Sequence, residues 1–185
     1  FRLLIKSMSD YVKVGLNASF FTMNNTEMLK KELTKMEEII HIPTVKTRQH
    51  YLRLNLPETY QNLLDFEVEE DYSMGYPDQL GFRASTCTPF YFYDLDFEIQ
   101  TPLKVFPFSI SDLVLRESLE LSEKQAFQKV KESFEIVKSV NGTFVTLFHN
   151  KILSNYGEWR GWKYFYEQLL QLTSVQKEFE NKGKK

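Results

Sequence analysis

Polar side chains that could carry acid–base chemistry or bind a ligand occur in or just after predicted strands at four places. They are Asn17, Arg48 with His50, Asp71 with Tyr72, and His149 with Asn150. Ligands in α/β folds gather at the carboxyl ends of strands, so several such groups in one fold favour a site. Each position alone has a simpler explanation. A single strand histidine is more often a satisfied structural residue, and an aspartate in an acidic run such as EEDY is usually a solvated cap.

Several functional classes are disfavoured by the sequence. It contains no glycine-rich phosphate loop, Walker pattern, HExxH or GxSxG motif, which argues against the commonest nucleotide-binding, zincin and serine-hydrolase sites. A formal net charge of −2 disfavours nucleic acid and anionic membranes as partners. The single cysteine, Cys87, excludes an internal disulfide, and no apolar run approaches the roughly 20 residues of a membrane span. Localisation and oligomeric state stay open.

Helices and strands are expected to alternate along most of the 185 residues. Apolar stripes and capping residues predict helices over 1–12, 24–41, 58–66, 122–140 and from about Trp162. Alternating or β-branched runs predict strands over 14–16, 44–54 and 142–150. The segment 81–115 is rich in aromatic and β-branched residues and is interrupted by Pro and Gly, so it should form strands or extended loops.

This alternation, with short connections, predicts an α/β fold with a mainly parallel, distorted, (β/α) barrel-like sheet. No repeat, low-complexity stretch or linker marks an internal boundary, so residues 1–172 should form one domain, followed by a frayed basic tail over 173–185. Aromatic residues make up 15% of the chain, which supplies a heavy core and leaves a minority of rings to line a groove.

Three runs, RQHYLRL, LPETYQNLLDFEVEEDYSMGY and GFRASTCTPFYFYDL, resemble a divergent bacterial branch of the polysaccharide deacetylases, the NodB-homology or family 4 carbohydrate esterases. The resemblance covers roughly residues 5 to 165. It implies a distorted (β/α) barrel that removes acetyl groups from sugar polymers. It also implies a divalent metal, usually zinc, held by one Asp and two His, with a second Asp as base and a late His as acid.

The resemblance assigns catalytic roles to three residues. His149 in TLFHN stands where the family has its catalytic acid, and Arg48 in TRQHY stands where the family has the Arg that orients the base. Asp71 in EEDYSMGY aligns with the acidic motif that follows.

Further positions are implied to bind substrate or metal. Arg83 in GFRAST belongs to the branch, and with Tyr72 and Asn150 it is expected to contact the sugar. His50 lies where most members have Pro, so it is a candidate metal ligand or substrate contact.

The sequence departs from the family at three motifs. Asn17-Ala18-Ser19 stands where the branch has His-Pro-Ser, and Phe106-Pro107-Phe108 stands where it has His-Pro-Phe. The Thr-Phe-Asp-Asp-Gly motif, which supplies the base and a metal-binding Asp, is missing and should lie upstream of Phe1, on a first strand. Either the sequence begins after that motif or the protein has lost it. Zinc is the expected cofactor in the first case, and no cofactor is expected in the second.

A non-catalytic carbohydrate-binding module, derived from such an enzyme, is the alternative. Its sugar-stacking candidates are Tyr72, Tyr76, Tyr91, Tyr93, Trp159 and Trp162, although any one of them is more simply a core residue. A purely structural role is the third possibility. The deacetylase hypothesis expects an acetylated polysaccharide or oligosaccharide as substrate.

Overall fold

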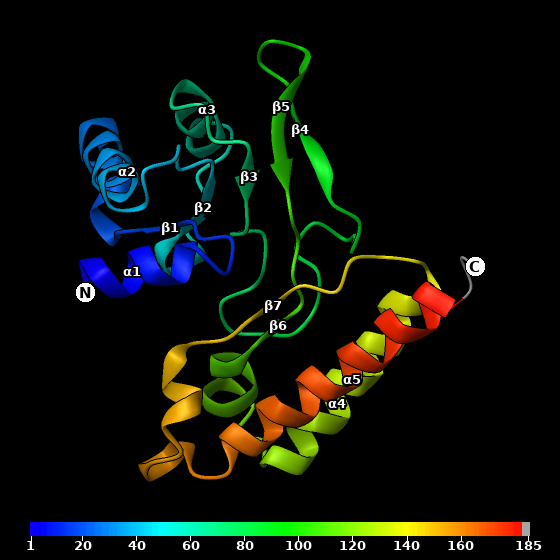
Figure 1. The fold of residues 1–185 in the computed structure, drawn as a ribbon. Coiled ribbons are helices and arrows are strands. Elements are labelled where there is room, and N and C mark those ends of the chain that lie inside the picture. The colour runs from blue at the N-terminus through cyan, green and yellow to red at the C-terminus, as the bar shows by residue number, and fades with distance from the viewer. Residues whose placement is uncertain (183–185) are drawn as a thin grey trace. The chain divides into compact units, whose positions relative to one another are not determined.

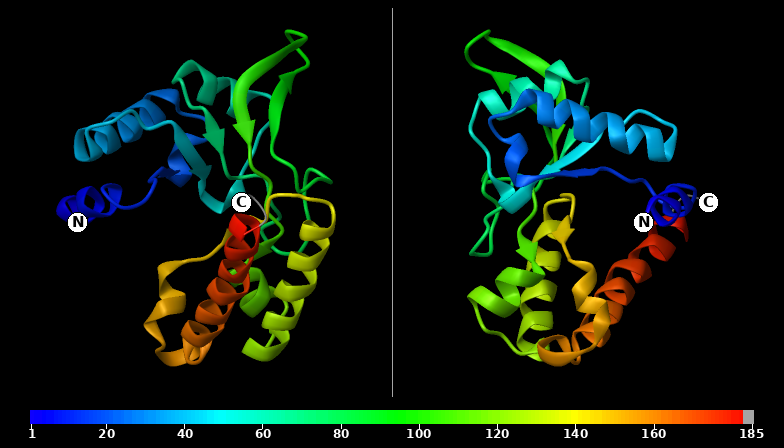
Figure 2. Two further views of the ribbon diagram at one scale, coloured as in Figure 1. Left: turned by 45° about the vertical axis from the view of Figure 1, so that its right-hand side comes forward. Right: turned by 90° about the vertical axis from the view of Figure 1, so that its left-hand side faces the viewer.

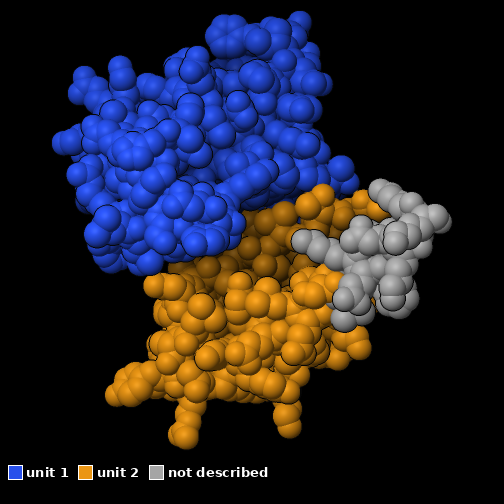
Figure 3. All heavy atoms as spheres, viewed as in Figure 1, with its two compact units in different colours: residues 1–75, 82–107 blue, residues 76–81, 108–185 orange. Residues whose placement is uncertain are grey.

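The computed structural model of the chain describes residues 1–182, and it describes side chains as far as residue 174. The described chain divides into two compact units (Figure 3). Unit 1 comprises residues 1–75 and 82–107, and unit 2 comprises residues 76–81 and the chain from residue 108 onward. Composition gave no sign of this division.

Unit 1 is a five-stranded sheet with three helices (Figure 1). In chain order its elements are α1 (Arg2–Ser9), β1 (Leu16–Ala18), α2 (Thr26–Ile40), β2 (Lys46–Gln49), α3 (Glu58–Asp65), β3 (Glu70–Asp71), β4 (Phe90–Asp94) and β5 (Ile99–Val105). The strand order is β1-β2-β3-β5-β4, in which only the β4–β5 pair is antiparallel.

Helix α2 forms for reasons visible in the sequence. The Asn25 side chain accepts a hydrogen bond from the backbone N–H of Met28 at 2.9 Å, which satisfies a donor that the helix itself leaves unpaired. Leu29 and Leu33 fall on one face and are buried. The helix ends at His41, whose φ of 61° is left-handed and cannot continue the helix.

The two faces of the unit 1 sheet differ in chemistry. Strand register places Thr47, Asp71 and Val105 side by side on one face, and all three are buried. The core on this face is built from α2, α3, β1 and β5 and includes Leu29, Leu33, Leu63, Leu103 and Ala18. The residues that alternate with these, Lys46, Arg48 and Glu70, lie on the opposite face. That second face is therefore polar.

Unit 2 contains a two-stranded parallel sheet and two long helices. Its elements are β6 (Ile110–Ser111), α4 (Glu123–Ser139), β7 (Thr146–Leu147) and α5 (Trp162–Lys182). A capping box starts α4, because Ser122 and Gln125 exchange hydrogen bonds between side chain and backbone. Helices α4 and α5 pack side by side (Figure 2) around a core that includes Val130, Trp162 and Phe165.

The structure confirms the expected α/β fold with a mostly parallel sheet, whereas a barrel is not confirmed. The strand expected over 142–150 is wrong in extent, because β7 pairs only at Thr146 and Leu147. The segment expected as a basic tail covers the last turns of α5 and residues 183–185, which lie outside the described residues. No helix in the described part of the chain is long and apolar enough to cross a membrane.

Candidate functional site

Two side chains with acid–base chemistry meet at the carboxyl ends of β6 and β7. Asp112 follows Ser111, the last residue of β6, and His149 comes two residues after Leu147, which ends β7. Ser111 and Leu147 are register partners in the parallel pair. The residues that follow them therefore emerge at the same edge of this small sheet.

Asp112 and His149 are joined by hydrogen bonds. Oδ1 of Asp112 lies 2.8 Å from Nδ1 of His149, and Oδ2 accepts the backbone N–H of His149, also at 2.8 Å. Oδ1 accepts the backbone N–H of Leu113 as well, at 2.9 Å. The carboxylate has no exposed surface, whereas the imidazole side chain is 39% exposed. Because an ionised carboxylate only accepts, Nδ1 must carry the proton, and Nε2 is the atom left for a ligand.

This geometry suits proton transfer. A buried carboxylate that accepts from Nδ1–H fixes the orientation of the ring and stabilises the imidazolium when Nε2 takes a second proton. His149 was predicted from the sequence as a site residue, whereas Asp112 was not. The signal was available, since Asp112 is a lone acidic residue directly after the apolar-polar run FSIS, where the preference for strand ends applies equally.

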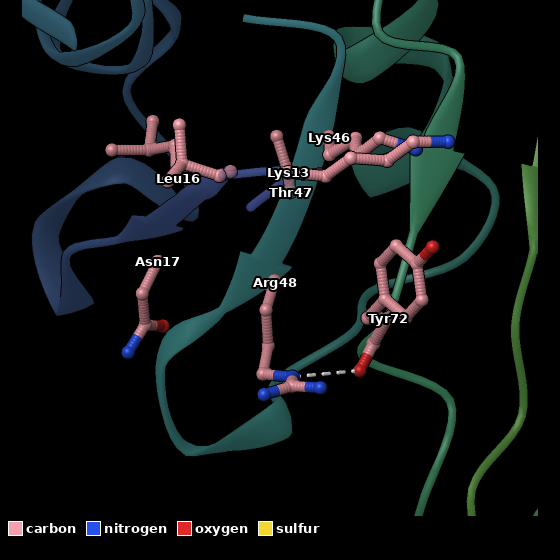
Figure 4. A pocket seen from close by; sticks show the side chains of 9 residues that line it. Lys13, Leu16, Asn17, Lys46, Thr47, Arg48 and Tyr72 are labelled. Atoms are coloured by element: carbon pink, nitrogen blue, oxygen red, sulfur yellow. Dashed lines mark hydrogen bonds between the residues drawn. The ribbon is translucent and has the colours of Figure 1, made fainter. Parts of the chain in front are cut away.

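The polar face of unit 1 holds a cavity of about 310 Å³ (Figure 4). Its polar lining includes Lys13, Asn17, Lys46, Arg48 and Tyr72. Nε of Arg48 donates to the backbone oxygen of Tyr72 at 2.9 Å, which ties the ends of β2 and β3 together.

Glu70 balances part of the positive charge beside this cavity. It forms an ion pair with Lys46 and accepts a hydrogen bond from the Tyr72 hydroxyl at 2.5 Å. Burial tends to raise the pKa of Glu70, but the hydrogen bonds from Lys46 and Tyr72 outweigh burial, so the pKa is lowered. The Tyr72 ring stacks on Phe106, with 4.7 Å between ring centroids. Tyr72 therefore packs within the sheet and lines the cavity at the same time.

Asp71, by contrast, lies on the helix-covered face and has no exposed surface. It accepts hydrogen bonds from the backbone N–H and the hydroxyl of Ser73, at 2.9 and 2.7 Å, and from the Tyr60 hydroxyl at 3.2 Å. Burial raises the pKa of Asp71, and these hydrogen bonds only partly offset it. Asp71 thus holds protein groups together, and a catalytic role for it stays a prediction.

The remaining expected residues lie at loops. Arg83 donates from Nη1 to the backbone oxygen of Leu52 at 3.3 Å, so it braces the loop after β2. His50 is exposed and its ring contacts that of Tyr51, with 4.3 Å between centroids. Asn150 is exposed in the turn after His149. Two of the aromatic stacking candidates, Trp159 and Trp162, are buried in the unit 2 core.

The donor set for a metal is incomplete. Zinc sites take three or four His, Cys, Asp or Glu ligands. Within the described residues no group of three or more such side chains could hold a metal ion. The His50 ring contacts that of Tyr51, and the Asp71 carboxylate accepts hydrogen bonds from Ser73 and Tyr60, so these two candidates do not form a metal site together, and zinc stays an expectation.

A solved structure resembles the chain in fold. The chain superposes on the crystal structure of a "putative polysaccharide deacetylase" from Mycobacterium smegmatis with a TM-score of 0.65 and 16% sequence identity. The match covers 91% of this chain and 60% of the other. No family model and no curated protein matches the sequence. The likeness therefore shows a shared α/β fold with that deacetylase-like structure.

Proposed function

We propose that the chain is a polysaccharide deacetylase-like domain that acts on acetylated sugars, with His149 as the acid of the reaction. The observation that carries the proposal is the Asp112–His149 pair at the strand ends of unit 2. The fold shared with the Mycobacterium smegmatis structure supports it.

The chemistry of the pair matches what amide hydrolysis requires. Water adds to the acetyl carbonyl and gives up a proton, the C–N bond breaks to release acetate, and the departing nitrogen must gain a proton to leave as an amine. Imidazolium at His149 donates that proton from Nε2 and returns to the neutral ring, whose Nδ1–H still donates its hydrogen bond to Asp112. The buried carboxylate holds the ring in one orientation throughout.

A metal would polarise the acetyl carbonyl and generate hydroxide. Within the described residues, no group of three His, Cys, Asp or Glu side chains supplies its ligands. A zinc requirement, which depends on a motif upstream of Phe1, stays a proposal.

Acetate release from N-acetylated chito-oligosaccharides tests the proposed function. We expect the full chain to release acetate, and His149→Ala to lower the rate by about 10²- to 10⁴-fold, the usual contribution of a general acid. Asp112→Asn should lower kcat with little change in KM, because it disturbs the ring's proton and orientation without touching substrate.

His41→Ala is the matched control, since His41 is exposed at the end of α2 and belongs to no hydrogen-bonded pair with a carboxylate among the described contacts. Wild-type activity in His149→Ala would show that the acid is assigned wrongly. Sugar binding without any acetate release from the wild-type chain would instead favour the carbohydrate-binding module.

A further inference from the structure

Aromatic side chains gather where β1 and β2 of unit 1 end. Phe20 and Phe21 follow β1, and Tyr51 follows β2. The Phe20 ring packs edge-to-face with the rings of Phe21 and Tyr51, at centroid distances of 5.8 and 6.2 Å. Phe21 is 72% exposed and Tyr51 is 69% exposed. These three residues form an aromatic platform.

The backbone that presents Tyr51 is strained. Tyr51 and Leu52 both have positive φ, of 55° and 56°, in a region that side-chain-bearing residues seldom occupy. Such strain persists only where the surroundings hold it. Here Leu52 is buried and its carbonyl accepts from Arg83, so the loop is fixed while Tyr51 points into solvent.

The Phe20–Phe21 turn is held in place as well. The backbone N–H of Ser19 donates to Glu32 on α2 at 2.9 Å. Thr22 is buried, and its hydroxyl donates to the Ser19 oxygen at 2.8 Å. Both halves of the platform are therefore anchored before any ligand binds, which reduces the entropy that binding would cost.

Two polar side chains contact the rings. The Arg53 guanidinium lies over the Phe20 ring at 4.5 Å from its centroid, and the exposed His50 imidazole contacts Tyr51. Asn17 and Arg48 are the next-to-last residues of β1 and β2. Asn17 is exposed, and both residues line the cavity on the polar face. Exposed ring faces beside hydrogen-bonding groups form a mixed surface, unlike a plain apolar patch.

We propose that the aromatic platform binds a pyranose ring of a neutral, acetylated glycan, with the sugar's apolar face on Tyr51 and Phe21 and its hydroxyls on His50 and Arg53. The C–H bonds on one face of a pyranose carry partial positive charge, which complements the negative face of an aromatic ring. The inference rests on the proposed function for its choice of an acetylated sugar.

Two other occupants fit less well. Nucleic-acid bases also stack on aromatic rings, but the chain's net charge of −2 does not favour a polyanion. A stable protein partner buries roughly 800 Å² on each side, more than three partly exposed rings can supply at about 150–250 Å² per aromatic side chain.

Binding of N-acetylchitotetraose to the full chain, measured by calorimetry and by saturation-transfer NMR, tests the inference. We expect Tyr51→Ala and Phe21→Ala each to weaken binding by about three- to tenfold, and Tyr51→Phe to keep wild-type affinity because the ring remains. Phe97→Ala is the matched control. Phe97 is 67% exposed in unit 1, in the turn between β4 and β5, away from these strand ends. It should leave affinity unchanged.

The outcomes separate this inference from the proposed function. If platform variants weaken binding but the wild type releases no acetate, the platform stands and the deacetylase proposal fails. If acetate is released with unchanged KM and affinity in Tyr51→Ala and Phe21→Ala, the platform is overturned and the deacetylase proposal stands. Absence of binding by the wild-type chain overturns the platform. A change of self-association in Tyr51→Ala, with affinity unchanged, also overturns it.

Discussion

At the scale of single residues, two buried aspartates differ in what they can do. Asp112 and Asp71 both follow or end strands and neither has exposed surface. Asp112 contacts an imidazole that reaches solvent, so its charge acts on a group able to exchange protons with a ligand. Asp71 contacts the hydroxyls of Ser73 and Tyr60 and the Ser73 backbone N–H. The partner, and not burial, therefore decides which carboxylate supports chemistry.

The raised pKa of Asp71 predicts how stability depends on pH. Burial raises the folded-state pKa above the unfolded value of about 3.9, so the folded chain holds this proton more tightly than the unfolded chain does. The stabilisation that this provides is full below the unfolded pKa and is lost as pH rises through the folded pKa. Relative to Asp71→Asn, which does not titrate, the wild type should therefore lose stability as pH rises from about 4 toward neutral.

Urea unfolding of both proteins across that pH range measures the effect. The Asn variant should be less stable at the acidic end by about 1–3 kcal/mol. Its amide nitrogen cannot accept a hydrogen bond, so some of the Ser73 and Tyr60 donors lose their acceptor. Asp65→Asn, at an exposed position in the last turn of α3, controls for the change in net charge. A stability difference that grows with pH would mean that the hydrogen bonds from Ser73 and Tyr60 outweigh burial.

At the scale of elements, local signals predicted the helices better than the strands. Helices α2 and α4 carry caps at Asn25 and Ser122 and regular apolar stripes, so they were found within two residues at each end. Strands β3, β6 and β7 pair over only two residues each, so any alternating pattern in them is short and weak. Asp112 was missed although the run FSIS precedes it, because the segment 81–115 was not divided into single strands and its partner lies 37 residues away.

The capping box of α4 predicts a measurable loss of stability. Ser122→Ala removes the hydroxyl that accepts a hydrogen bond from the Gln125 backbone N–H. That N–H, in the first turn of a 17-residue helix, is then left without this partner. We expect a loss of about 1 kcal/mol in the free energy of unfolding. Ser122→Thr keeps a capping hydroxyl and should lose much less. Equal losses in the two variants would show that the cap does not act through the hydroxyl.

At the scale of the whole chain, the α/β class followed from the alternation of elements, but the division into units did not. The unit boundaries fall near Gly75, Phe82 and Pro107, where no Ser- or Gly-rich linker or change of composition marks them. The two cores, one containing Leu63 and the other Leu115, therefore arise from the path of the chain in three dimensions and not from a boundary in the sequence. Long-range packing of this kind leaves no periodic signal in the sequence.

Separate cores predict separate responses to matched core mutations. Leu63 and Leu115 are both fully buried, so Leu→Ala at either position removes the same atoms and should cost about 2–5 kcal/mol. We expect Leu63→Ala to speed amide hydrogen exchange in β2 and β5 more than in α4, and Leu115→Ala to do the reverse, because each cavity weakens the contacts of its own unit first. Exchange that accelerates equally in all three elements in both variants would show that the chain opens as one cooperative unit, and the two cores would then be a single energetic entity.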